Sequence, residues 1–137
     1  MRKLDQRGVA SFEFVVVAVA FFTLVFAILD LARYAITMQS LRALANAGAR
    51  SMMISDCYVN AAINKTAPTC SGDPLPSAAA KRAIAPFLYA GGLSPTLGMT
   101  MAGSAFTVTA SEPGFTMLVP VWGTALNAPS ASTQVPF

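Results

Sequence analysis

Residues 7–29 read RGVASFEFVVVAVAFFTLVFAIL, and residues 14–29 hold no charged side chain and only one mildly polar residue, Thr23. Together with residues 9–13 the stretch has about the length, ~20 residues, that a helix needs to cross the hydrocarbon core of a bilayer. One carboxylate, Glu13, lies near its start. A charged side chain in a spanning helix is costly and indicates a function by default.

The composition supports a membrane segment. Of 137 residues, 55% are hydrophobic and 11% charged, whereas a soluble domain is normally about one quarter charged. Arg2, Lys3 and Arg7 precede the apolar run, opposed only by Asp5. This asymmetry predicts a cytoplasmic N-terminus and a translocated C-terminal part. A cleaved secretory signal and a buried core helix are the alternatives. Against the secretory signal, the run is longer than the usual hydrophobic region of a signal peptide and lacks a clear small-x-small cleavage site.

The helix is expected to continue beyond the apolar run. No proline occurs between Val9 and Ala67, and good helix formers dominate, so we predict one helix from about Val9 to about Ile54. Its second half is expected to be amphipathic, because apolar and small residues recur at alternating three- and four-residue spacing. The predicted stripe is Leu31, Tyr34, Met38, Leu41, Ala45, Gly48 and Met52.

The sequence of residues 55–137 predicts a small α+β region. Residues 55–77 are expected to be a loop, and Ser77 to cap a short helix over residues 78–90 that Pro86 bends or shortens. Residues 105–111 are strand-like. Residues 115–122 are a second strand candidate, although Pro120 fits an edge strand or an irregular crossing better than a central strand. Residues 128–137 are a third, and the strands are expected to form an antiparallel sheet on the long helix.

We therefore predict an α+β fold with a long N-terminal helix, transmembrane in its first half and amphipathic in its second. The expected organisation is a cytoplasmic leader over residues 1–8, a transmembrane helix over 9–29, its continuation over 30–54, and a small periplasmic region over 55–137.

Two side-chain pairs follow from spacing and compartment. Cys57 and Cys70 both follow the apolar run, so they would reach an oxidising compartment where nearby cysteines usually form a disulfide; two unrelated free thiols are the alternative. Asp30 and Arg33 are three residues apart where the helix would leave the bilayer, so they can pair. An exposed pair there would contribute little to stability.

Catalysis has little support in the sequence. The chain has no histidine, the usual general base, and it lacks GxSxG, Walker-type and HExxH motifs. No metal, cofactor or small-molecule substrate is expected, since two thiolates do not complete a zinc shell. The scattered basic residues form no aromatic-basic motif, so no nucleic acid is expected either.

Residues 8–14 carry a more specific pattern. A basic tract, Gly8 and a glutamate five residues later, Glu13, precede an apolar helix. This resembles the processing site of type IV prepilins, which are cut after the glycine and carry Glu at the fifth mature position. Glycine leaves the backbone unobstructed at the cut. Cleavage would free an ammonium on Val9, which a neighbouring subunit's Glu13 could neutralise and so set register in an apolar bundle.

Within the prepilins, the first third of the chain looks like the N-terminal signature of the TadE-like family of the tight-adherence (Tad) pilus system. The features that carry the resemblance are Arg7-Gly8, Glu13-Phe14, the segment 29–33 (LDLAR) and the segment 47–50 (AGAR). Phe14 is a departure, because the family's major pilins commonly have tyrosine after the glutamate.

The resemblance implies a minor pilin or pseudopilin of an Flp-type fibre, held in the bacterial inner membrane or incorporated in the pilus at the cell surface. It also implies a prepilin peptidase, other pilins and Tad assembly-platform proteins as partners, with roles in assembly and adhesion. Two rivals stay open: an unprocessed membrane-anchored periplasmic scaffold or binding protein, and a type II secretion pseudopilin.

Overall fold

The computed structural model describes residues 7–102 and 104–137. Most of the predicted leader therefore lies outside the described residues. The elements follow one another as α1 (Arg7–Met53), α2 (Asp56–Ile63), α3 (Ala78–Ile84), α4 (Pro86–Ala90), β1 (Thr96–Ala102), β2 (Ala105–Ser111), a 3-10 helix η1 (Pro120–Trp122) and β3 (Ser130–Pro136). This confirms the α+β class and the single long N-terminal helix.

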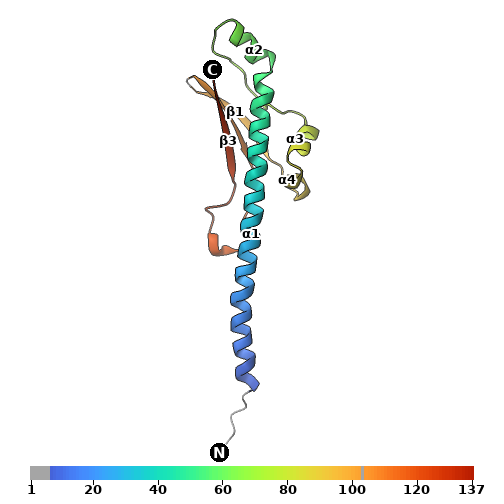
Figure 1. Cartoon of the computed structure of the whole chain (residues 1–137), viewed down its shortest axis with the longest axis vertical. Helices are drawn as coiled ribbons and strands as arrows, with labels where there is room; N and C mark the ends of the chain where they lie inside the picture. Colours follow the sequence, from blue (N-terminus) through green and yellow to red (C-terminus); the bar gives the residue numbers. More distant parts are fainter. Residues whose placement is uncertain (1–6, 103) are drawn as a thin grey trace, which may run out of the picture.

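Helix α1 divides into two parts along its length. Its N-terminal part extends alone beyond the other elements, and its C-terminal part carries the rest of the chain (Figure 1). Within the described residues one helix is long and apolar enough to cross a membrane, and very little of its apolar part is buried within the protein. The physical reason for the division is the sequence: large apolar side chains fill residues 14–29, whereas small residues allow close packing farther along.

The three strands form one antiparallel sheet with the order β1-β2-β3. Val108 in the central strand pairs with Met99 of β1 and with Thr133 of β3. Because side chains alternate between the faces of a strand, β2 sends Phe106, Val108 and Ala110 to one face, and all three are fully buried. That face packs on α1, which contacts both β2 and β3.

The core lies between the C-terminal half of α1 and its coverings. In the view of Figure 1, β3 lies on one side of α1, and α3 and α4 lie on the other. Ala85 and Leu88 extend the core from the α3–α4 side. The residues that α1 contributes are Leu41, Leu44, Ala45, Ala49 and Met52.

Gly48 marks the closest approach of α1 to the sheet. A Cβ atom at this position would lie 3.0 Å from Leu97 Cδ2, 3.1 Å from Pro74 Cγ and 3.1 Å from Val108 Cγ1. Glycine normally weakens a helix interior by about 1 kcal/mol relative to alanine. Here the missing side chain makes room for three neighbours, so the glycine is explained by packing.

The predicted stripe is correct from Leu41 onward and wrong at its start. Leu41, Ala45, Gly48 and Met52 are buried, but Leu31 is exposed. The sheet does not extend that far along α1, and Leu31 stays 37% exposed. The face that is buried instead includes three polar residues, Asp30, Thr37 and Ser40.

Residues 55–77 are not wholly a loop, because they contain α2. The Ser55 side chain accepts a hydrogen bond from Tyr58 N, and Asp56 occupies the first turn, where the helix dipole favours an acidic residue. The helix breakers that suggested a loop, Pro68, Gly72, Pro74 and Pro76, all follow α2.

The expected helix over residues 78–90 exists as two short ones. The Ser77 side chain accepts a hydrogen bond from Ala80 N, as predicted for its N-cap. Pro86 ends α3 and stands in the first turn of α4, where its missing N–H costs no helical bond.

The strand predictions are partly right. The strands over 105–111 and 130–136 are present. Strand β1 was not predicted, because Gly98 interrupts the strand-like pattern in the sequence, although the strand itself is continuous. Its signal was the alternation of Leu97, Met99 and Met101, which point toward the core. The candidate strand over 115–122 is wrong. This segment is irregular and ends in η1, in keeping with the irregular crossing that Pro120 allowed.

Candidate functional site

The first feature of functional interest is the uncovered apolar half of α1. Large apolar side chains project from it in all directions, and the structure packs almost nothing against them. A continuous apolar surface of this kind marks a membrane or protein interaction site. The exposed residues are Val9, Phe12, Phe14, Val15, Val16, Val17, Val19, Phe21, Phe22, Leu24, Phe26, Ile28 and Leu29.

The predicted cleavage site lies at the beginning of this helix. Because α1 begins at Arg7, the Gly8–Val9 peptide bond falls in its first turn. The N–H groups of a first turn have no intrahelical acceptors, so an extended backbone is accessible there at small cost. The predicted cleavage residues, Gly8 and Val9, thus stand on the most easily opened part of the helix.

Glu13 and Phe14 are both exposed on α1. Val9 and Glu13 are four residues apart, so they share one face of the helix. Within residues 7–102 and 104–137 the ion pairs are Arg33–Asp30 and Lys81–Asp73, and neither includes Glu13. Its carboxylate is therefore available to a group from outside the described part of the chain.

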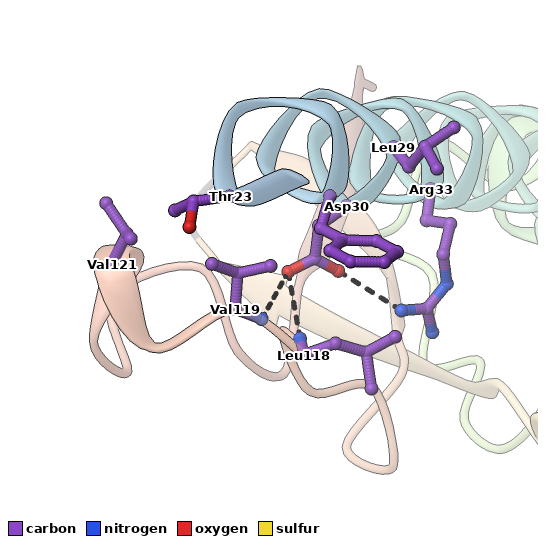
Figure 2. Close-up of a pocket in the computed structure, with 8 residues that line it drawn as sticks. Thr23, Leu29, Asp30, Arg33, Leu118, Val119 and Val121 are labelled. Carbon is purple, nitrogen blue, oxygen red and sulfur yellow. Dashed lines mark hydrogen bonds and ion pairs between the residues drawn. The ribbon is translucent and has the colours of Figure 1, made fainter. Parts of the chain in front are cut away.

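Asp30 has a role that spacing alone did not reveal. Its carboxylate is buried, with 2% of the residue exposed, and it points away from α1 toward the segment that precedes η1 (Figure 2). Oδ2 accepts hydrogen bonds from Leu118 N at 2.8 Å and from Val119 N at 3.0 Å. Oδ1 accepts one from Arg33 Nη1 at 3.1 Å. The expected Asp30–Arg33 pair is present, but it is part of a larger junction.

Aromatic contacts complete this junction. The Arg33 guanidinium lies 5.5 Å from the centre of the Phe115 ring, within the range of a cation–π interaction. The Tyr34 and Phe115 rings lie 6.1 Å apart. Phe115 is fully buried, so α1 holds the start of the irregular segment by an aromatic anchor and its continuation by Asp30. One sequence signal could have suggested this junction. Asp30 ends a long apolar run and has only one nearby cation, Arg33, so a buried carboxylate there would need further hydrogen-bond donors.

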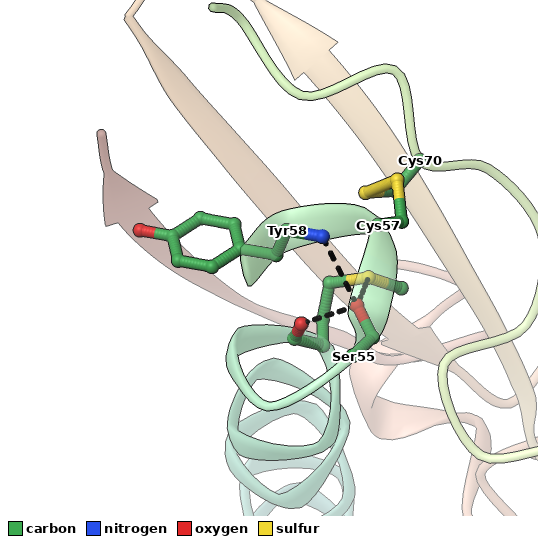
Figure 3. The surroundings of a disulfide bond; sticks show 5 residues. Ser55, Cys57, Tyr58 and Cys70 are labelled. Atoms are coloured by element: carbon green, nitrogen blue, oxygen red, sulfur yellow. Dashed lines mark hydrogen bonds between the residues drawn. A yellow bond between two sulfur atoms is a disulfide. The ribbon is translucent and has the colours of Figure 1, made fainter. Parts of the chain in front are cut away.

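Cys57 and Cys70 are joined by a disulfide. The bond connects the first turn of α2 to the extended chain that follows it (Figure 3). Cys70 belongs to the buried core, and Tyr58 packs edge-on against Phe106 with ring centres 5.7 Å apart. The disulfide therefore fastens the end of the molecule that is farthest from the apolar half of α1.

Two acidic side chains in the described part of the chain, Asp30 and Glu112, are buried. No group of three or more cysteine, aspartate and glutamate side chains that could hold a metal ion lies within residues 7–102 and 104–137. Glu112 is buried, and its Oε1 accepts a hydrogen bond from Gly114 N at 3.1 Å. Asp30 is already committed to three donors. These carboxylates organise backbone segments.

Comparison with known families gives a match over the first part of the chain. Residues 8–50 match the model of a family described as TadE-like protein, which confirms the resemblance found in the sequence. The matched segment begins at Gly8 and covers Glu13, Phe14, Asp30 and Arg33, but it stops before α2. Neither the curated proteins nor the solved structures gave a match to the chain.

Proposed function

We propose, starting from the match of residues 8–50 to the TadE-like family, that this chain is a minor pilin or pseudopilin of a Tad (Flp) type IV pilus. It resides in the bacterial inner membrane as a single-pass protein, with its N-terminus in the cytoplasm and residues 55–137 in the periplasm. A prepilin peptidase cleaves it after Gly8, and it is needed for pilus assembly and adhesion.

The observation that carries this proposal is the bare apolar half of α1, which begins at the cleavage motif. Val9–Leu29 spans about 30 Å at 1.5 Å per residue, which is close to the hydrocarbon thickness of a bilayer. Lipid covers this surface before assembly, and the same surfaces of other pilins cover it once the subunit leaves the membrane. The family indicates a non-enzymatic protein associated with the Tad pilus, and an exposed helix of this kind suits such a role.

Processing gives Glu13 its function. Hydrolysis of the Gly8–Val9 bond leaves a positively charged amine on Val9, at the start of an apolar helix. Glu13 of a neighbouring subunit neutralises that amine and fixes the axial position of the two helices. Because an uncompensated charge buried among apolar helices is strongly destabilising, only the correct register is stable.

The rest of the chain, residues 30–137, acts as a rigid head on the apolar half of α1. The sheet, α3 and α4 cover the second half of α1, and the Cys57–Cys70 disulfide is suited to the oxidising periplasm. The head contacts other pilins and the assembly-platform proteins at the membrane.

The proposal is tested by complementation in the native cell. Cells that lack this chain should make few or no pili, and the wild-type chain should restore them. Glu13→Ala should be inserted and cleaved but should fail to restore pili. Thr23→Val is the matched control, because Thr23 is also exposed on the apolar half and, among the described residues, its hydroxyl donates only to Val19 O of the same helix. This variant should restore pili. Normal pili in cells without the chain would refute the function, and normal pili with Glu13→Ala would refute the pairing.

A further inference from the structure

The segment from Met117 to Trp122 lies beside the part of α1 that is predicted to be in the membrane. In Figure 1 this segment, with η1, is the part of the head nearest the bare half of α1. Val121 and Thr23 line the same groove (Figure 2), and Thr23 lies about two helical turns, or about 10 Å, before Asp30. The segment thus reaches back along α1 from the Asp30 junction toward the membrane.

The surface of this segment is apolar. Leu118 is 73% exposed and Val121 is 64% exposed. Residues 113–137 contain no charged side chain. Between the segment and α1 lies a groove of about 550 Å³ whose lining is almost entirely apolar. Phe26 and Leu29 form its α1 side, so the apolar surface of the segment is continuous with the bare half of the helix.

The backbone N–H groups in the first half of this segment are hydrogen-bonded to side chains. Met117 N donates to Asn127 Oδ1 at 2.9 Å, and Leu118 N and Val119 N donate to Asp30 Oδ2. Residue 120 is proline, which has no N–H to satisfy. The backbone N–H groups from Met117 to Val119 therefore need no water when this part of the segment enters the interfacial layer.

We propose that residues 117–122 form a second membrane contact, which inserts into the interfacial layer of the same bilayer that α1 crosses. Leu118 and Val121 enter among the acyl chains, and one acyl chain occupies the groove beside Phe26. Insertion of an apolar surface to about 5–10 Å is typical of interfacial segments. Arg33 also lines the groove, and its side chain is 46% exposed, so its charge can face lipid phosphate.

The consequence is a fixed depth for α1. Because irregular backbone cannot enter the hydrocarbon core, the core must end near Phe26 rather than at Leu29, with Asp30 just above it. In the processed chain, Val9–Phe26 then spans the hydrocarbon with about 18 residues, which is within the range of about 17–25 that a spanning helix needs. The two contacts hold the head at one height and one orientation on the membrane, ready for neighbouring pilins. This inference rests on the proposed membrane insertion of α1.

Trp122 allows a direct test, since it is the only tryptophan in the chain. The full chain is reconstituted in vesicles of phosphatidylcholine with a minority of phosphatidylglycerol, and the acyl chains are brominated either near the carbonyl end or near the methyl end. Trp122, which lies in the same segment as Leu118 and Val121, should be quenched by the brominated lipid, and more strongly by bromine near the carbonyl end. The matched control is Trp122→Phe with Ile63→Trp, which puts a tryptophan at an exposed apolar position on α2, at the far end of the head; its emission should not respond to brominated lipid.

Charged substitutions test the contact itself. Leu118→Asp with Val121→Asp should abolish quenching of Trp122 while the protein stays in the vesicles after carbonate washing. If the wild-type protein resists carbonate but Trp122 is no better quenched than the tryptophan at position 63, the lipid contact is refuted and the proposed function stands. If Trp122 becomes shielded only at high protein-to-lipid ratio, a second copy covers the segment and the lipid contact is refuted. Release by carbonate would refute both proposals.

Discussion

The carboxylate of Asp30 accepts a hydrogen bond from the backbone N–H of Leu118 at 2.8 Å, although the two residues are 88 positions apart in the chain. This bond joins the end of the apolar half of α1 to the irregular segment between β2 and β3. Asp30 is buried and Leu118 is exposed. The polar atoms of the junction are therefore hidden on the helix side, while the apolar side chains of the segment face outward.

Asp30→Ala should detach this segment from α1. It removes the acceptor of two backbone donors and the partner of Arg33. A single hydrogen bond to a charged group contributes about 1.5–3 kcal/mol, and losses within one network do not add in full. We expect the free energy of unfolding to fall by about 3 kcal/mol, measured by urea titration in detergent with Trp122 fluorescence. Asp30→Asn keeps one acceptor oxygen and should lose less.

The control for this prediction is Asp56→Ala, which removes an exposed carboxylate from the first turn of α2. It should cost less than about 1 kcal/mol, the usual size of a surface dipole interaction. Equal losses for Asp30→Ala and Asp56→Ala would show that Asp30 does not hold the segment.

The disulfide should stabilise the end of the head that is farthest from the membrane. For a closed loop of this length the chain-entropy model gives about 3 kcal/mol. The double variant Cys57→Ser with Cys70→Ser should therefore unfold at lower urea concentration than the wild type, and adding reductant to the wild type should reproduce that shift. An unchanged unfolding midpoint under reductant would mean that the bond contributes nothing to the native head.

Gly48→Leu should disrupt the contact between α1 and the sheet. The new side chain would meet Leu97, Pro74 and Val108, and overpacking a core typically costs about 1–3 kcal/mol. Ala35→Leu places the same side chain on an exposed position of the same helix and should leave the free energy of unfolding within about 0.5 kcal/mol. If both variants are equally stable in urea, the close approach at Gly48 is not required.

Local sequence rules predicted the elements that depend on short-range patterns. The long helix follows from the absence of proline and the apolar run, the Ser77 cap follows from a serine before an alanine-rich segment, and β2 follows from its β-branched and aromatic residues. The resemblance of residues 8–50 to the TadE-like family rested on fixed spacings near the N-terminus, which a sequence displays directly.

The features that local sequence rules did not predict depend on contacts between residues that are distant in the chain. Leu31 looks like part of the buried stripe until the position of the sheet on α1 is known. Gly98 suggests a break, yet β1 persists because β2 pairs with it along its whole length. Asp30 was recognised as a partner of Arg33 three residues away, but its bonds to Leu118 and Val119 connect segments whose proximity no local pattern encodes.

Gly8→Val should block maturation, because a branched side chain would crowd the scissile bond and restrict its backbone. Immunoblots of membranes from the native cell should show only the longer precursor. Ala18→Val, a similar change within the apolar helix, should be processed as the wild type is. Normal cleavage of Gly8→Val would remove Gly8 as the determinant of the cut.

The central claim is that the working subunit begins at Val9, with a free amine one helical turn before Glu13. The most direct measurement is the intact mass of the wild-type protein extracted from the membranes and pili of its native cell. The account predicts a mass that lacks the first eight residues and includes one disulfide. A protein that retains residues 1–8 in cells with functional pili would contradict it.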